Sequence, residues 1–144
     1  MSATIHAGAV ALGPWGVLVR GAPGAGKTAL ALALIARWHA SGHYAALVAD
    51  DRVDLRASNG RLVARPAEAL RGLAEIRGYG IAAIPYLPAV RLTHVADLED
   101  APERMPDPSR VPLRGAHLPR ICLFARQPEA GATALWTLLQ PSGS

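Results

Sequence analysis

The sequence predicts a single-domain α/β protein in which a mixed β-sheet is flanked by helices. Three observations lead to this class. A glycine-rich loop at residues 21–28 separates an apolar run from a segment rich in alanine and leucine, which are the strongest helix formers. A second apolar run ends abruptly on Asp50 and Asp51. Further along, two alternating runs flank an Asn-Gly pair, which is typical of a β-hairpin.

The elements around the glycine-rich loop follow from local residue patterns. Residues 3–10 alternate weakly and residues 15–20 are apolar, so two strands separated by a Gly-Pro turn are expected. Residues 28–38 contain neither glycine nor proline and predict a helix. Residues 44–49 form the short, continuously apolar run that is typical of a buried parallel strand. Strand, loop, helix and strand in this order predict a βαβ unit.

The second half of the chain alternates between regular and irregular segments. The antiparallel hairpin is expected at 53–57 and 61–65, which makes the sheet mixed. Other short apolar runs and helix-forming stretches predict a helix at 66–73, strands at 90–95 and 120–125, and a helix at 129–140. Residues 97–112 are acidic and rich in proline, which predicts an exposed loop or lid. Since one domain contains roughly 100–200 residues, all of 1–144 is expected to form one domain.

Composition excludes several classes of protein. Hydrophobic residues make up 51% of the chain and charged residues 18%, which is a globular composition. Apolar stretches fall well short of the ~20 residues of a membrane span, and the first residues lack the pattern of a signal peptide. We therefore expect a cytoplasmic protein with no membrane partner. The single cysteine, Cys122, excludes a disulfide framework and a zinc site built from several thiolates.

The positive charge of the chain does not indicate a nucleic-acid partner. The formal net charge is +4, but the arginines are scattered and aromatic residues make up only 5% of the chain. Proteins that bind nucleic acids gather basic residues on one surface and often interleave aromatic side chains that stack on bases. We therefore expect no nucleic acid among the partners.

The loop at 21–28 carries the clearest chemical signal. It fits the phosphate-binding pattern G-x-x-x-x-G-K-[ST] in full, through Gly21, Ala22, Pro23, Gly24, Ala25, Gly26, Lys27 and Thr28. In this pattern backbone N–H groups and the positive end of the following helix face the phosphate oxygens. Lys27 is the only lysine in the chain, and we expect it to reach the β and γ phosphates and stabilise transition-state charge. Thr28 is expected to offer its hydroxyl to Mg²⁺.

Other ionisable side chains are expected near this loop. Asp50 and Asp51 follow the strand at 44–49, and strand ends deliver residues to the ligand-binding edge of such a sheet. An acidic residue there either supports Mg²⁺ or accepts a proton from the attacking group, and both roles stay open for this pair. Glu75 and Arg77 lie in E-I-R-G-Y-G, where the glycines indicate a close backbone approach. Their charges suit a metal and phosphate shell, and a plain surface turn stays open as the alternative.

Three separated segments together resemble the catalytic domain of HPr kinase/phosphorylase, the bifunctional serine kinase of bacterial phosphotransferase systems. The segments are G-A-P-G-A-G-K-T at 21–28, L-V-A-D-D-R-V-D at 47–54 and E-I-R-G-Y-G-I at 75–81. His6, which lies 21 residues before Lys27, also matches a histidine of the family pattern. The resemblance implies a P-loop kinase fold of the HPr kinase type.

The resemblance also implies roles for individual residues. The family's catalytic aspartate, the base for phosphorylation, falls on Asp50, and its helper histidine falls on His6. The Mg²⁺ ligands fall on Thr28, where the family usually has serine, and on Glu75. A further catalytic arginine is similar to Arg104 in P-E-R-M-P.

These roles predict transfer of the γ-phosphoryl group of ATP, with Mg²⁺, to a serine of HPr or of a related phosphocarrier protein. The chain resembles short members of the family that lack the N-terminal domain. A stretch that long members use for dephosphorylation has no counterpart in residues 111–120, so the resemblance implies the kinase reaction rather than the phosphorylase reaction. Long members form hexamers, and a homo-oligomer stays open for this chain.

Two other functions stay open at the level of sequence. A small-molecule P-loop kinase would carry a lid with a cluster of arginines, whereas residues 97–112 offer mostly acid and proline. A non-catalytic, nucleotide-dependent sensor would bind a protein partner without turnover. The adjacent Asp50 and Asp51 favour an enzyme over such a sensor.

Overall fold

A six-stranded mixed sheet forms the centre of the computed structural model, which describes residues 2–102 and 110–139. Its strands follow the order β11 (Arg110–Leu113), β12 (Ala116–Phe124), β10 (His94–Glu99), β3 (Trp15–Gly21), β2 (Gly8–Leu12) and β4 (Ala45–Ala49). β3, β10 and β12 are parallel, whereas β2 is antiparallel to both β3 and β4. The mixed sheet predicted from the sequence is confirmed.

The predicted βαβ unit needs one correction. The strand after the helix, β4, pairs with β2 and does not pair with β3. A tight turn at Gly13 and Pro14 places β2 directly beside β3, because sequential strands joined by so short a connection pair with each other. β2 therefore occupies the edge of β3 that a simple βαβ unit would give to β4.

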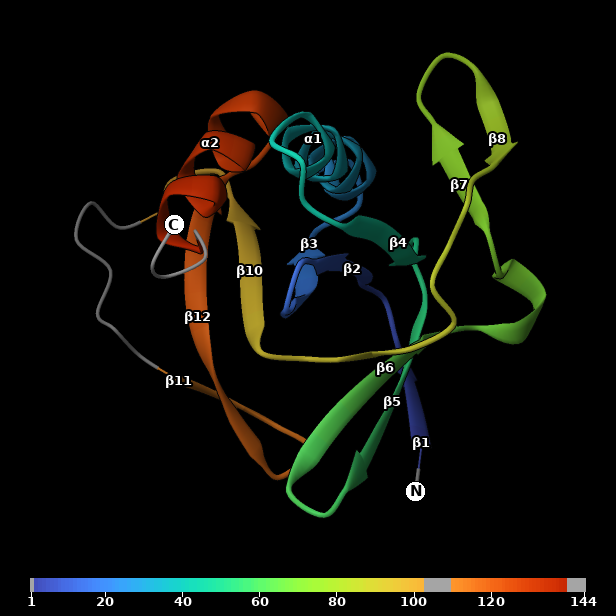
Figure 1. The fold of residues 1–144 in the computed structure, drawn as a ribbon, viewed down its shortest axis with the longest axis vertical. Coiled ribbons are helices and arrows are strands. Elements are labelled where there is room, and N and C mark those ends of the chain that lie inside the picture. The colour runs from blue at the N-terminus through green and yellow to red at the C-terminus, as the bar shows by residue number, and fades with distance from the viewer. Residues whose placement is uncertain (1, 103–109, 140–144) are drawn as a thin grey trace.

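Two helices cover one face of the central sheet (Figure 1). α1 (Lys27–Ala40) begins directly after the glycine-rich loop, and α2 (Pro128–Leu138) follows β12. Trp38 and Trp136 join the helices in an edge-to-face contact with ring centroids 4.8 Å apart. Buried side chains of α1 and α2 pack with those of the sheet in the main core. Neither helix of the described residues has the length and apolar character that a membrane crossing requires.

The opposite face of the central sheet packs against a second, antiparallel sheet. This sheet contains β1 (Ser2–Ile5), β5 (Val53–Ser58), β6 (Arg61–Pro66) and β9 (Val90–Arg91). Its hairpin turns at Asn59 and Gly60, which have φ angles of 51° and 74°. Such positive values are the reason that Asn-Gly predicts a hairpin, and the prediction is confirmed.

A third, two-stranded sheet projects from the body of the molecule (Figure 1). It is formed by β7 (Leu73–Ile76) and β8 (Gly80–Ala83). The helix predicted at 66–73 is wrong, because this stretch runs from the end of β6 to the start of β7 and its one helical turn is the 3₁₀ turn η1 (Glu68–Leu70). Gly72 follows this turn with a φ of 70° and packs against the ring of Tyr86. A Cβ added to Gly72 would lie only 2.8 Å from that ring.

Two predicted strands are each divided between two sheets. The run at 3–10 breaks at His6 and Ala7 into β1 and β2, and the run at 90–95 separates into β9 and β10. In both cases the chain crosses from the second sheet to the central sheet. Alternation of apolar residues continues through such a crossing, because both sheets bury one face against the other.

The exposed loop predicted at 97–112 is wrong at both ends. Residues 97–99 belong to β10 and residues 110–112 to β11. The middle of the predicted loop, including Arg104, lies outside the described residues.

Asp97 is buried in β10 because two arginines neutralise its charge. Arg20 of β3 donates two hydrogen bonds to it, at 2.7 and 2.8 Å, and Arg120 of β12 donates another. Arg120 also pairs with Glu99. Burial alone would raise the pKa of Asp97, but the hydrogen bonds and charges of both arginines outweigh it, so the pKa lies below its ordinary value. These ion pairs tie the three parallel strands together near their carboxyl ends.

Asp97→Asn should lower the free energy of unfolding at pH 7 by about 1–3 kcal/mol, since it removes the charge from buried hydrogen bonds. Because the pKa of Asp97 is lower in the folded protein, the carboxylate stabilises the wild type above its unfolded pKa of about 3.8. That stabilisation is lost as the pH falls through the folded value. In urea unfolding measured from pH 7 down to about pH 2, the free energy of unfolding should therefore fall less for Asp97→Asn than for the wild type.

The matched control is Asp100→Asn, because the side chain of Asp100 is 78% exposed in its pair with Arg126. An exposed pair contributes little, so this change should alter stability by less than about 1 kcal/mol. Equal acid sensitivity of Asp97→Asn and the wild type would contradict the role given to Asp97.

Candidate functional site

The glycine-rich loop connects the carboxyl end of β3 to the first turn of α1. Gly24 and Gly26 have φ angles of 82° and 93°, in the region that favours glycine. Gly26 is the N-cap of α1, and no side chain of the described residues caps that helix end. The N–H groups of the first turn are therefore free to bind an anion.

Close packing also requires glycine at the first position of the loop. A Cβ on Gly21 would lie 3.1 Å from the Cβ atoms of both Ala25 and Leu98. A hydrogen bond of 3.0 Å from the N–H of Ala25 to the carbonyl of Ala22 closes the loop on itself. The sequence therefore folds here into the strand, loop and helix geometry that it predicts.

Lys27 lies over the loop and contacts its carbonyl groups. Its Nζ donates to the carbonyl oxygens of Gly21 at 3.0 Å and Ala22 at 3.4 Å. The ammonium is thus held beside the free N–H groups of the helix, with three donors that can exchange carbonyl oxygens for phosphate oxygens.

Asp50 connects three segments that are far apart in the sequence. Only 8% of Asp50 is exposed, and one carboxylate oxygen accepts a 2.6 Å hydrogen bond from the hydroxyl of Thr28. The other accepts a 3.0 Å hydrogen bond from the backbone N–H of Glu75. The end of β4 is thereby tied to the start of α1 and to β7. The side chain of Glu75 itself is exposed.

Asp51 has different surroundings from Asp50. It is exposed and lies on the wall of a cavity beside the loop. Its φ of 71° is uncommon for a residue other than glycine, although aspartate tolerates it better than most. The two adjacent carboxylates therefore differ: that of Asp50 is buried and hydrogen-bonded, and that of Asp51 is exposed to the cavity.

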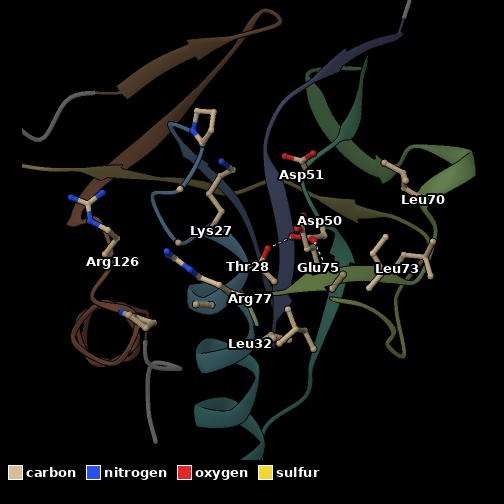
Figure 2. A pocket seen from close by; sticks show the side chains of 18 residues that line it. Lys27, Thr28, Leu32, Asp50, Asp51, Leu70, Leu73, Glu75, Arg77 and Arg126 are labelled. Carbon is tan, nitrogen blue, oxygen red and sulfur yellow. Dashed lines mark hydrogen bonds between the residues drawn. The ribbon is translucent and has the colours of Figure 1, made fainter. Parts of the chain in front are cut away.

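The cavity has a volume of about 860 Å³. Figure 2 shows the side chains that line it. Its polar part contains Lys27, Thr28, both aspartates and Glu75. Its apolar part is formed by side chains of α1, η1 and the projecting hairpin, namely Leu32, Leu70, Leu73, Ile76 and Ile81. A volume of this size suits a ligand as large as a nucleotide.

Two arginines also line the cavity. Arg77 was singled out from the sequence together with Glu75, and the turn of the β7–β8 hairpin brings it there. Arg126 was missed by the sequence analysis. It follows directly after the strand predicted at 120–125, and that position at a strand end was the signal that could have identified it.

His6 does not line the cavity, and its side chain is exposed. It lies in the turn between β1 and β2. Because Ile5 pairs with Val53 and Ala9 pairs with Ala49, this turn lies against the turn that carries Asp51. The structure therefore brings His6 to the neighbourhood of the aspartates, at the rim of the site.

The residues of the site fit Mg²⁺ and a triphosphate. The hydroxyl of Thr28 and the carboxylates of Asp50 and Glu75 are oxygen ligands of the kind that Mg²⁺ requires. Among the described residues, no group of three or more His, Cys, Asp or Glu side chains is arranged to hold a metal alone. Mg²⁺ commonly takes one or two carboxylates and completes its shell with substrate phosphates and water. Lys27 and the free N–H groups suit those phosphates.

Comparison with known proteins gives consistent matches. The model of the family described as HPr Serine kinase C-terminal domain matches residues 1–91. HPr kinase/phosphorylase of Streptococcus thermophilus is 46% identical over 79 residues, which are 54% of this chain and 24% of the relative. The enzyme of the same name from Clostridium tetani is 40% identical over 72 residues, or 50% of this chain and 22% of the relative. These matches span about a quarter of each curated relative.

A solved structure matches nearly the whole chain. The HPr(Ser) kinase/phosphatase from Coxiella burnetii has a TM-score of 0.77 and 28% sequence identity. The match covers 94% of this chain and 95% of that chain. The fold class predicted from the sequence is thereby confirmed.

Glu75→Ala should raise the Mg²⁺ concentration needed for half-maximal ATP binding by about tenfold, the effect expected when one charged ligand contact is lost. The fold should stay intact, because the side chain is exposed and Asp50 is bonded to the backbone of residue 75. Titration calorimetry at several Mg²⁺ concentrations measures the effect. Glu68→Ala is the control, since Glu68 is also exposed and does not line the cavity. A lower unfolding temperature with unchanged Mg²⁺ dependence would show that Glu75 is structural.

Proposed function

The chain belongs to the HPr serine kinase C-terminal domain family, and we propose that it is an ATP-dependent protein kinase that phosphorylates a serine of HPr or of a related phosphocarrier protein. The observation that carries this proposal is the hydrogen-bonded link from Thr28 through Asp50 to Glu75, directly beside the phosphate-binding loop. The link gathers the oxygen ligands of Mg²⁺ where the loop offers N–H groups and Lys27 to phosphates. Bound Mg²⁺ would neutralise charge on those phosphates.

Phosphoryl transfer depends chiefly on positioning and on charge stabilisation. In the proposed reaction the N–H groups of the first turn of α1 hold the phosphates, and Lys27 exchanges the carbonyls of Gly21 and Ala22 for phosphate oxygens. Its ammonium then stabilises the negative charge that develops in the transition state. The acceptor hydroxyl enters from the cavity.

The geometry favours Asp51, rather than Asp50, as the base that accepts the proton of the serine hydroxyl. Both oxygens of Asp50 already accept hydrogen bonds, and the side chain is buried, so an incoming hydroxyl would have to break one of these contacts. Asp51 is exposed on the cavity wall. We therefore propose the reverse of the assignment drawn from the resemblance: Asp51 is the base, and Asp50 positions Thr28 and β7. His6, in the adjacent turn, would assist Asp51.

Lys27→Ala should reduce transfer by at least about 10²-fold, because no other lysine exists to stabilise the developing charge. Lys27→Arg should fail as well, since a planar fork cannot take the place of a compact ammonium over this tight loop. The measurement is transfer of label from γ-labelled ATP to purified HPr, followed by identification of the phosphorylated residue. Label on a small molecule would instead indicate a small-molecule kinase, and ATP binding without any transfer would indicate a sensor. Near-normal transfer by Lys27→Ala would end the proposal for this loop.

The two aspartates can be separated by asparagine substitutions, which keep the shape and remove the charge. Asp51→Asn should bind ATP and Mg²⁺ normally and lose transfer by ~10²–10⁴-fold, the range of general acid–base catalysis. Asp50→Asn should weaken Mg²⁺-dependent ATP binding. Calorimetry and single-turnover transfer measure the two effects. If Asp50→Asn keeps its ATP affinity and has the larger chemical defect, the assignment from the resemblance is right and the one from the geometry is wrong.

A further inference from the structure

Arg126 lies at the junction between β12 and α2, on the wall of the cavity that faces the glycine-rich loop. In Figure 2 it lies on the opposite side of Lys27 from Asp50 and Asp51. The carboxylates and the hydroxyl of Thr28 thus form one side of the polar region. Arg126 extends the positive side beyond Lys27.

The backbone of Arg126 is fixed to the phosphate-binding loop. Its N–H donates a 2.8 Å hydrogen bond to the carbonyl of Ala25, and its Cα would lie only 3.5 Å from a Cβ placed on Gly26. Its φ of 59° lies in the left-handed region, which is unfavourable for arginine. A strained backbone that is held against a ligand-binding loop is typical of a residue with a function there.

The guanidinium of Arg126 is available for another partner. Its only described ion pair is with Asp100, and the two side chains are 57% and 78% exposed. A pair as exposed as this contributes little to stability. Arg20 and Arg120 differ, because both are committed to the buried Asp97. Of these three arginines, Arg126 is the one that lines the cavity.

We propose that Arg126 is a phosphate-binding residue of the site, which exchanges Asp100 for the phosphate oxygens of the bound nucleotide. A guanidinium suits this exchange, because its planar fork can donate two parallel hydrogen bonds to phosphate. The inference rests on the nucleotide-binding part of the proposed function and not on the identity of the acceptor. Asp100 then acts as a competing partner that occupies the guanidinium when no phosphate is present.

The test compares the full chain with three variants. Arg126→Gly removes the guanidinium and places at this φ the residue that tolerates it best, so its unfolding temperature should stay close to that of the wild type. Arg126→Lys keeps the charge without the fork. Asp100→Ala breaks the same ion pair from the other side and leaves Arg126 in place. Titration calorimetry with Mg²⁺ and ATP measures affinity, and unfolding temperatures are recorded in parallel.

Arg126→Gly should bind ATP about tenfold or more weakly, which is the loss expected for a hydrogen bond to a charged group. Arg126→Lys should recover part of the affinity, and Asp100→Ala should bind ATP at least as tightly as the wild type. Equal affinities of Arg126→Gly and the wild type would overturn the inference. So would equal losses in Arg126→Gly and Asp100→Ala, because the ion pair would then matter only for structure. If the wild type binds ATP but transfers nothing to HPr, the proposed kinase function fails, and the affinities still decide the role of Arg126.

Discussion

The hydrogen-bonded carboxylate of Asp50 is the constraint on which the site depends. It accepts hydrogen bonds from the hydroxyl of Thr28 and from the backbone N–H of Glu75, so one buried group fixes the start of α1, the end of β4 and strand β7 of the projecting hairpin. A buried carboxylate is unfavourable unless such donors satisfy it. The arrangement of the site therefore depends on the hydrogen bonds that Asp50 accepts. Without them, the hairpin that carries Glu75 and Arg77 would lose its hydrogen bond to Asp50 and, through Asp50, its link to Thr28.

A second buried carboxylate performs a similar task on the other side of the loop. Asp97 holds Arg20 and Arg120, and thereby aligns β3, β10 and β12 where these strands approach their carboxyl ends. Those ends lead into the glycine-rich loop, Asp100 and Arg126 respectively. Arg126 and the two aspartates of the cavity lie on opposite sides of Lys27, which suits a ligand that carries both phosphate and a divalent cation (Figure 2).

Local sequence patterns predicted the loop, helix and hairpin of the fold, but they could not predict which distant strands pair. Gly21 to Thr28, the helix after them and the Asn59-Gly60 hairpin each depend on the conformations of a few consecutive residues, and all three are confirmed. The turn at Gly13 and Pro14 is a local signal for the pairing of β2 with β3. The pairing of β4 with β2 could not be predicted, because antiparallel pairing across a helix leaves no local signal. Residues 97–112 suggested a loop because they are acidic and rich in proline. Only the arginines from two other strands make Asp97 compatible with burial. Arg126 likewise comes beside the glycine-rich loop through pairing between strands that are distant in the sequence, because β12 pairs with β10 and β10 with β3. The relative roles of Asp50 and Asp51 depend on the φ of Asp51 and on the partners of Asp50, neither of which composition reveals.

In the proposed binding mode, phosphates bind at the open end of α1 while Asp50 links that end to β7. Backbone amide NMR, recorded during titration with Mg²⁺ and a non-hydrolysable ATP analogue, tests this binding mode directly. We expect the largest shift changes at Gly24, Gly26, Lys27 and Thr28, together with the N–H of Glu75, which reports on Asp50. Unchanged loop amides, or changes gathered in the sheet of β1, β5, β6 and β9, would contradict it.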